Sequence, residues 1–383
     1  MDFDRIVDRR NTESIKWRYF PEDVLPLWVA DMDFQSPPEV LEALHRRVDH
    51  GIFGYGIPPA DLSEIVVNYL HRHFDWKPQP AHLSYVPGVV TGFNLAIRAF
   101  SEPGSSVLFN TPAYPPFFAA PQSARLPYVT NPLVRGADGS YNLDFERFEK
   151  QIEAENVKVF ILCNPQNPTG RVFTREELTR LAEICLRHKV IICSDEIHCD
   201  ITYDGRKHIP IASLDPEIAD ITLTLLAPSK TYNIAGLYAS VAVISNPELS
   251  RRYREFKNGL TSGPDLLALT AARAAYLHGD AWLKELIAYL QANRDWMAEF
   301  IAAELPGVEM RKPEGTFLAW LDCQKLDLQP NPQRFFQEHA RVGLNCGADY
   351  GPERSSFVRL NFGTQRSVLV EALERMAAAL KSR

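Results

Sequence analysis

Three polar motifs in the sequence each follow a short apolar run, and each carries a side chain that can take part in chemistry. The motif N-P-Q-N-P-T-G contributes the amide of Asn167. The acidic motif S-D-E-I-H-C-D contributes Asp195, and the motif A-P-S-K-T-Y contributes Lys230. A carboxylate that is buried without a partner costs free energy, so Asp195 needs one. An amide, an acid and an amine after three apolar runs therefore predict a shared polar site.

Each motif taken singly has a simpler explanation. The prolines and the glycine around Asn167 are typical of a turn between two elements. An isolated lysine such as Lys230 is most often a solvated surface amine. A shared site follows only if the apolar runs are neighbouring strands whose ends lie together.

The apolar runs are rich in β-branched residues and predict buried strands. One helix start precedes the runs, at Ser36–Glu39 with Ser36 as the N-cap, and another lies between two of them, at the capping box Thr174–Glu177. This alternation predicts an α/β fold whose mostly parallel sheet is covered by helices on both faces. Ligands of such sheets bind beyond the carboxyl ends of the strands, where the three motifs stand. The predicted strands are 106–109, 157–163, 190–193, 221–226 and 240–244.

The length of 383 residues predicts more than one lobe. No internal repeat or flexible linker separates the lobes, so we expect them to interleave. The segments 317–321 and 357–362 stand among helical patterns and indicate a smaller α+β domain. We expect residues 1–45 and 285–383 to build this domain from both termini, and residues 46–284 to form the large domain.

The composition is that of a globular protein, with 45% apolar and 23% charged residues. A net charge of -7 without a basic run argues against nucleic-acid binding. The apolar runs are too short to span a bilayer, and Asp2, Asp4 and Arg5 stand where a signal peptide has its apolar core. We therefore expect a cytoplasmic protein without membrane contact. The six cysteines form no C-x-x-C pair, and we expect buried free thiols.

Other common sites lack support in the sequence. No G-x-G-x-x-G motif and no G-x-x-x-x-G-K-[ST] motif occurs, so dinucleotide-binding and P-loop chemistry have no basis. A zinc site can be imagined from Cys193, His198 and Cys199, but their spacing matches no usual ligand pattern. We expect no metal site.

The three motifs and their spacing resemble the aminotransferase class I/II superfamily of fold-type I enzymes, which use pyridoxal 5′-phosphate (PLP). The resemblance covers nearly the whole chain. Further segments resemble one branch of this superfamily, the cystathionine β-lyases of MalY/PatB type, which are C–S lyases. These segments are 28–34 (W-V-A-D-M-D-F), 85–90 (Y-V-P-G-V-V), 195–198 (D-E-I-H), 229–237 (S-K-T-Y-N-I-A-G-L) and 358–362 (V-R-L-N-F).

The resemblance implies roles around the cofactor ring. Lys230 would hold PLP as a Schiff base and act as general acid and base once substrate displaces it. Asp195 would keep the pyridine nitrogen protonated, and Asn167 would donate a hydrogen bond to the 3′-oxygen. Tyr114 would stack on the ring, although aromatic residues beside prolines are usually core residues. His198 is expected at the cofactor as well, in the place where many aminotransferases have a tyrosine, which favours the lyase branch.

The resemblance also implies how the phosphate is bound. The backbone N–H groups of Gly88-Val89-Val90 at a helix start would bind it, and Ser229 would add a hydroxyl. Tyr55 of a neighbouring subunit would reach the phosphate or the substrate as a catalytic residue, so we expect a homodimer with shared active sites. Many relatives have a basic residue eight positions after the lysine, where this chain has Tyr238.

The amino-acid substrate has its own expected residues. Arg359 would bind the α-carboxylate in a bidentate pair, a geometry that lysine cannot copy. Ala30 and Asn167 are implied as further substrate-binding residues.

The implied reaction is α,β-elimination from cystathionine or a related S-substituted cysteine, which gives a thiol, pyruvate and ammonia. An aminotransferase shares every cofactor contact, and a cyclase or dehydratase can use the same fold, so both alternatives stay open. A non-catalytic regulator is an alternative of another class. The intact Lys230, Asp195 and Asn167 favour an enzyme, and the enzyme-like sequence starts too early for a preceding DNA-binding domain.

Overall fold

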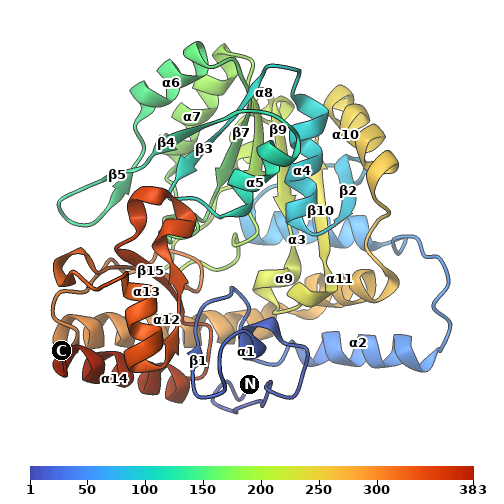
Figure 1. Cartoon of the computed structure of the whole chain (residues 1–383). Helices are drawn as coiled ribbons and strands as arrows, with labels where there is room; N and C mark the ends of the chain where they lie inside the picture. The colour runs from blue at the N-terminus through green and yellow to red at the C-terminus, as the bar shows by residue number, and fades with distance from the viewer.

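The computed structural model describes residues 1–383, and a seven-stranded mixed sheet lies at its centre (Figure 1). Five neighbouring strands run parallel, which confirms the mostly parallel sheet. Strand β10 runs antiparallel to both of its neighbours, a reversal that the sequence did not predict. From edge to edge the strands are β2 (Leu83–Pro87), β10 (Ala239–Ile244), β9 (Thr222–Leu226), β8 (Ile191–Asp195), β7 (Val157–Cys163), β3 (Ser106–Thr111) and β4 (Tyr128–Pro132).

Helices cover both faces of this sheet, as predicted. Successive residues of a strand point to opposite faces, and the core divides accordingly. Phe109 and Val159 belong to one apolar cluster, whereas their neighbours Leu108 and Phe160 belong to another. Helices α4 (Val89–Phe100), α5 (Pro116–Ser123) and α10 (Pro247–Leu260) pack in the first cluster, and α6 (Phe145–Ala154), α7 (Arg175–Arg187) and α8 (Pro216–Asp220) pack in the second.

The two predicted helix starts have different outcomes. The capping box is present, because the Thr174 hydroxyl accepts from the Glu177 N–H at 3.2 Å and the Thr174 N–H donates to the Glu177 carboxylate at 2.8 Å. The N-cap predicted at Ser36 is wrong, since the following proline holds that position at the start of α2 (Pro38–Asp49). The Ser36 hydroxyl instead donates to the Asn233 carbonyl at 3.1 Å, a long-range partner that helix periodicity cannot reveal.

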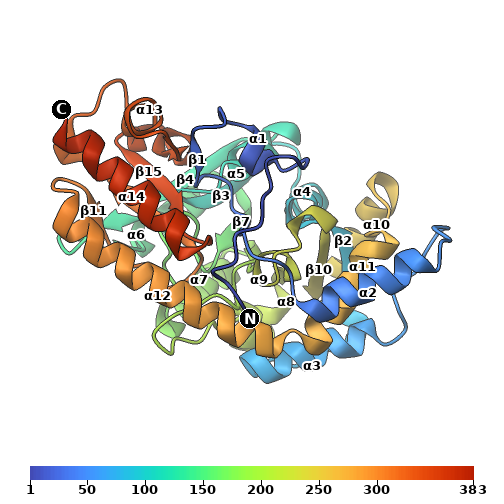
Figure 2. The ribbon, with the colours of Figure 1, turned by 90° about the horizontal axis from the view of Figure 1, so that it is seen from below.

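A four-stranded antiparallel sheet forms the C-terminal part of the fold, at the lower left of Figure 1. The segments predicted at 317–321 and 357–362 are its strands β12 and β15, so the smaller α+β unit is present. Helices α12 and α14 lie side by side against it (Figure 2). The elements are α12 (Asp280–Glu304), β11 (Glu309–Met310), β12 (Leu318–Asp322), α13 (Pro332–Phe335), β14 (Asn345–Cys346), β15 (Phe357–Asn361) and α14 (Arg366–Lys381).

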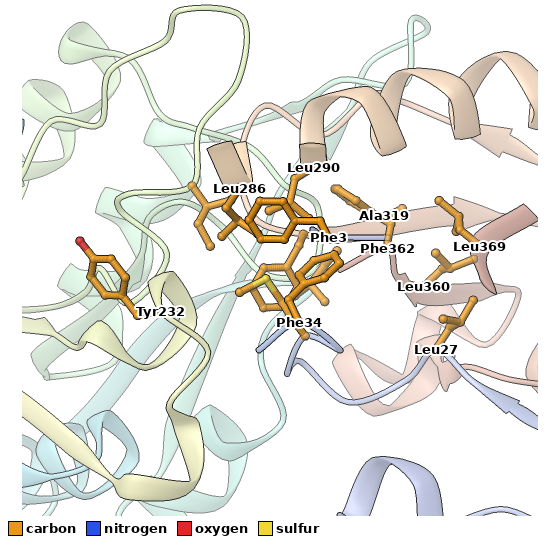
Figure 3. Packing of buried hydrophobic residues seen from close by; sticks show 14 of the residues in the cluster. Phe3, Leu27, Phe34, Tyr232, Leu286, Leu290, Ala319, Leu360, Phe362 and Leu369 are labelled. Atoms are coloured by element: carbon orange, nitrogen blue, oxygen red, sulfur yellow. The ribbon is translucent and has the colours of Figure 1, made fainter. Parts of the chain in front are cut away.

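N-terminal residues share a core with this C-terminal unit. The rings of Phe3 and Phe34 meet edge to face with centroids 5.2 Å apart, in the same cluster as Leu360 and Leu369 (Figure 3). Strand β1 (Leu25–Pro26) pairs in parallel with β13 (Val342–Gly343). The domain boundaries predicted at residues 45 and 284 fall inside α2 and α12, and the division stays a prediction.

The remaining elements connect these parts. Helices α2 and α3 pack against α11 beside the large sheet. No helix combines the length and the apolar character that a membrane span requires. All six cysteines are free and five are buried, while Cys346 is partly exposed. The bounds are α1 (Ile15–Arg18), α3 (Leu62–Phe74), β5 (Val134–Arg135), β6 (Tyr141–Asn142), α9 (Pro228–Thr231) and α11 (Leu266–His278).

Candidate active site

A cavity of about 1070 Å³ lies where β7 and β8 end, and its wall combines distant parts of the chain. Residues 29–36, 87–91 and 229–239 contribute three of its sides. All residues predicted for the site except Tyr55 line this cavity, namely Ala30, Gly88, Val89, Val90, Tyr114, Asn167, Asp195, His198, Ser229, Lys230 and Arg359. The fold therefore brings the three sequence motifs to one place.

Asp195 is the last residue of β8 and is only 4% exposed. Its carboxylate accepts one hydrogen bond, from the Ile197 N–H at 3.2 Å. Burial raises the pKa of Asp195 to about 7, although that hydrogen bond and the nearby Lys230 act to lower it. A buried carboxylate with so little compensation is suited to a cationic partner inside the cavity.

Lys230 lies in the short helix α9, directly after the sheet strand β9. Its Nζ donates to the Ala30 carbonyl at 2.6 Å. Burial lowers the pKa of Lys230 to about 8, the carboxylates of Asp31 and Asp195 raise it, and Arg359 lowers it. Near neutral pH a useful fraction of the amine is therefore uncharged and nucleophilic.

Arg359 lies on β15 and is held in place by three acceptors. Its Nη1 donates to Asn167 Oδ1 at 3.0 Å, and its Nη2 donates to the Trp28 carbonyl at 2.8 Å and to Asn345 Oδ1 at 2.7 Å. Its Nε is buried and has no hydrogen-bond partner. Because Asn167 accepts through Oδ1, its Nδ2 donors remain available to a ligand.

His198 and Tyr114 add neutral polar groups to the cavity. Burial lowers the pKa of His198 well below its usual value, and the positive charges of Lys230 and Arg359 act in the same direction. The His198 Nδ1 is buried without a hydrogen-bond partner. Burial raises the pKa of Tyr114, so its phenol keeps its proton at neutral pH.

The start of α4 forms the other end of the cavity. Gly88 is the N-cap with φ of +94°, a conformation that favours glycine. The first N–H groups of a helix lack backbone acceptors and carry partial positive charge, which suits an anion. Ser229 adds a hydroxyl. Tyr238 also lines this end, with φ of +53° and 65% exposure, and its uncharged side chain contributes no cation for an anion.

Tyr55 lies outside the cavity of its own chain. The side chain is fully exposed, and it lines a separate hollow of about 800 Å³ together with Tyr85 and Leu266. The predicted contact is with the phosphate or the substrate of a neighbouring subunit, so it stays a prediction.

Several charged residues of the site were missed by sequence reasoning. Arg9 pairs with Asp31 and Asp33 at the cavity wall, and the fully buried Lys16 donates to Asp33 at 2.6 Å. Asn345, which holds Arg359, was missed too. The W-V-A-D-M-D-F motif pointed to the segment but gave its two aspartates no role, and nothing local signals that distant cations pair with them.

The family model described as "Aminotransferase class I and II" matches residues 22–376. The chain belongs to the aminotransferase class I and II family. Its fold of a mixed, mostly parallel seven-stranded sheet with a small antiparallel sheet is that of fold-type I PLP enzymes.

Similar proteins place this family member in one branch. The cystathionine β-lyase PatB of Bacillus subtilis (strain 168) is 42% identical, over 99% of this chain and 100% of the relative. The structure of cystalysin from Treponema denticola, which contains PLP, has a TM-score of 0.96 at 32% identity over 100% of this chain and 99% of that one. The PLP-bound C–S lyase from Staphylococcus hominis has a TM-score of 0.94 at 33% identity over 99% of both chains. The chain is thus a PLP-dependent enzyme of the C–S lyase branch.

The cavity of this family member fits PLP at both ends. The buried Asp195 carboxylate can hold a protonated pyridine nitrogen, and the Asn167 Nδ2 can donate to the 3′-oxygen. The Lys230 Nζ can bond to the aldehyde carbon, and the N–H groups after Gly88 can bind the phosphate.

Proposed function

We propose that this chain is a carbon–sulfur β-lyase that cleaves L-cystathionine or a related S-substituted cysteine to a thiol, pyruvate and ammonia. The observation that supports this most is the convergence of Lys230, Asp195 and Arg359 on one cavity in a chain of the C–S lyase branch. His198 stands where many aminotransferases have a tyrosine, and this also supports the lyase branch.

When bound, PLP supplies an aldehyde for the substrate amine and a protonated ring that withdraws electrons from the substrate Cα. Lys230 would carry out the proton transfers of the reaction. Its neutral Nζ removes the proton from Cα, and the electron pair of that bond forms the Cα–Cβ double bond. The Cβ–S bond breaks with its pair on sulfur, and the Lys230 ammonium returns the proton to the thiolate. Such general acid–base help contributes about 10²–10⁴-fold to a rate.

Arg359 and Asn167 would orient the amino acid. The guanidinium is already held by Asn167, Trp28 and Asn345, so it can bind the α-carboxylate without first losing much side-chain entropy. The buried Arg359 Nε is a further donor. Binding of the α-carboxylate by Arg359 would orient the substrate Cα–H bond relative to the Lys230 Nζ.

Asp195 would hold the proton at the pyridine nitrogen. Burial makes the ionised form of its carboxylate costly, and a cationic ring would offset that cost. His198, neutral by burial, adds no competing positive charge beside the 3′-oxygen.

The direct test is a reaction without an acceptor for the amino group. Purified protein is incubated with PLP and L-cystathionine in the absence of any keto acid, and pyruvate and free thiol are measured. The proposal expects both products in equal amounts. Products that form only after a keto acid is added, together with transfer of the amino group, would show an aminotransferase instead.

We also propose a homodimer in which each active site receives Tyr55 from the partner. Tyr55 is exposed within an apolar stretch, since the side chains of Ile52, Phe53 and Ile57 are exposed as well. An exposed patch of this kind is typical of a surface that another chain covers. The predicted cytoplasmic location stays a prediction.

Subunit mixing tests the shared site. Lys230→Ala and Tyr55→Phe variants are purified separately, dissociated together and allowed to reassemble. A mixed dimer would contain one site with both defects and one site with none, so activity returns above either parent. If Tyr55 serves its own chain, both sites of the mixed dimer carry one defect each and no activity returns.

A further inference from the structure

The segment 29–33 lies directly against the reactive amine. The single hydrogen bond of Lys230 Nζ goes to the Ala30 carbonyl, at 2.6 Å. The next residue, Asp31, lines the same cavity, and its Oδ1 is buried without a hydrogen-bond partner. A buried carboxylate oxygen without a donor favours a cation nearby.

Contacts from three distant residues hold Asp31 and its neighbour Val29 in this position. Asn361 Nδ2 donates to the carbonyls of Val29 at 2.6 Å and of Asp31 at 2.7 Å. Lys16 Nζ donates to the Asp31 carbonyl at 3.2 Å, and Arg9 pairs with the other carboxylate oxygen, Oδ2. The backbone of Asp31 is therefore held by Lys16 and by Asn361 of β15, and its carboxylate is held by the ion pair with Arg9.

Four of the ionisable groups that line the cavity interact electrostatically with Lys230. The other ionisable groups of the lining are Arg9, Glu13, Asp33, Tyr114, Cys163 and Tyr238. Asp31 comes from the segment before α2, Asp195 and His198 come from the end of β8, and Arg359 comes from β15. His198 is neutral because its pKa is lowered. With cofactor and substrate present, Asp195 is engaged by the ring and Arg359 by the α-carboxylate. Of the two carboxylates that act on Lys230, the one left is that of Asp31, whose Oδ2 pairs with Arg9 while its Oδ1 makes no hydrogen bond.

We propose that Asp31 is a positioning residue for Lys230, whose carboxylate stabilises the ammonium form while a proton travels from the substrate Cα to the leaving sulfur. This proposal rests on the proposed function. The proton that Nζ takes from Cα is the one that it gives to the thiolate, so no further reactant is needed. Asp31 acts by charge at a distance and makes no bond to the substrate.

The test uses the apoenzyme and PLP alone, so that it does not depend on the lyase reaction. PLP capture is followed by the absorbance change on bonding to Lys230 from about pH 6 to about pH 10, since only the neutral amine attacks the aldehyde. The wild-type capture rate should rise with pH around a midpoint close to the Lys230 pKa of about 8. Asp31→Asn should lower the midpoint by about 1 pH unit, because an opposite charge nearby shifts a pKa by that order. Capture at pH 7 then becomes about five-fold faster.

Glu13→Gln is the matched control. Glu13 lines the same cavity from the same N-terminal segment, but it is exposed and makes no hydrogen bond. Removing its charge should leave the midpoint where it is. Asp31→Glu, which keeps the charge, should return the midpoint to the wild-type value, and Asp31→Ser provides a second uncharged variant if the asparagine variant is too unstable.

A merely structural Asp31 gives a different pattern. Its variants would capture PLP more slowly at every pH with an unchanged midpoint, which would overturn the proposal. In the lyase assay, Asp31→Asn should lower kcat more than it changes KM, because substrate binding does not use the carboxylate. If PLP capture shifts as expected but no lyase substrate turns over, the proposed reaction fails while the role of Asp31 at Lys230 stands.

Discussion

The two ends of the cavity are built differently. At the end proposed for the cofactor ring, called the ring end, Asp195, Asn167 and Arg359 are almost fully buried. Asp195 and Arg359 are strand residues, and Asn167 lies in the loop after β7. At the opposite end, proposed for the phosphate, Val90 and Tyr238 are 41% and 65% exposed, and the N–H groups at the start of α4 are the available donors. The first end is enclosed by residues of one chain, whereas the second is open to solvent.

This difference separates two tasks. Control of protonation needs low dielectric, because a buried carboxylate or amine changes its pKa strongly with each neighbour. Retention of an anion needs only donors and a favourable dipole, which remain effective near solvent. The open end can therefore be completed by a second subunit, while the ring end must be fixed by the fold of one chain.

Lys230→Ala should have the largest effect and would confirm that chemistry depends on the ring end. We expect turnover of S-substituted cysteines to fall by about 10²–10⁴-fold or more, since both acid and base are lost. Pyruvate release measures this, with Lys325→Ala as a control on an exposed lysine outside the cavity. Full activity together with the yellow absorbance of bound PLP would contradict the role of Lys230.

Asp195→Asn should separate activity from stability at the same end. We expect activity to fall by about 10²-fold or more, because the charge that supports the ring is removed. The apoenzyme should become more stable at the same time. Burial raises the folded-state pKa of Asp195 from 3.8 to about 7, so apoenzyme stability falls as pH rises from about 4 to about 7.

The asparagine variant has no charge to bury, so its advantage should grow across that pH range and reach its full size above about pH 7. The expected gain is at most a few kcal/mol. Thermal unfolding of both apoproteins at low and high pH measures it. An equal difference at every pH would mean that Asp195 ionises normally in the folded protein.

Arg359→Lys tests substrate orientation, with an intermediate effect. We expect kcat/KM to fall by about ten- to a hundredfold, in line with about 1.5–3 kcal/mol for a lost charged hydrogen bond. PLP affinity should stay near that of the wild type, because Arg359 is assigned to the substrate. Steady-state kinetics measure the effect on the substrate, and PLP titration measures the effect on the cofactor. A loss confined to PLP binding would show that Arg359 binds the cofactor and not the substrate.

Tyr238→Arg should have the smallest effect and tests the open end directly. A guanidinium there should lower the dissociation constant of PLP by about two- to tenfold at low salt, and less at high salt because the site is exposed. Fluorescence titration of the apoenzyme measures this, with Tyr238→Phe as the uncharged control. Unchanged affinity at low salt would indicate that the phosphate already has a cation, contributed by the partner subunit.

Much of the fold could be predicted because its signals are local. Strand runs such as 157–163 and the capping box at Thr174 depend on neighbours within a few residues. The misassigned N-cap at Ser36 shows the limit, since a hydroxyl beside prolines has the same local pattern whether it caps a helix or binds a distant carbonyl such as that of Asn233. The reversal of β10 likewise leaves no trace in its apolar pattern.

The sequence by itself determined which residues are able to do chemistry here, because amine, acid, amide and guanidinium groups stand in motifs whose spacing is fixed along the chain. Only the tertiary structure decided the protonation states of these groups. Arg359 meets Asn167 across 192 residues, and Arg9 and Lys16 approach Asp31 and Asp33 from another segment. Protonation depends on burial and on the charges within a few ångströms, and those neighbours exist only once the chain has folded.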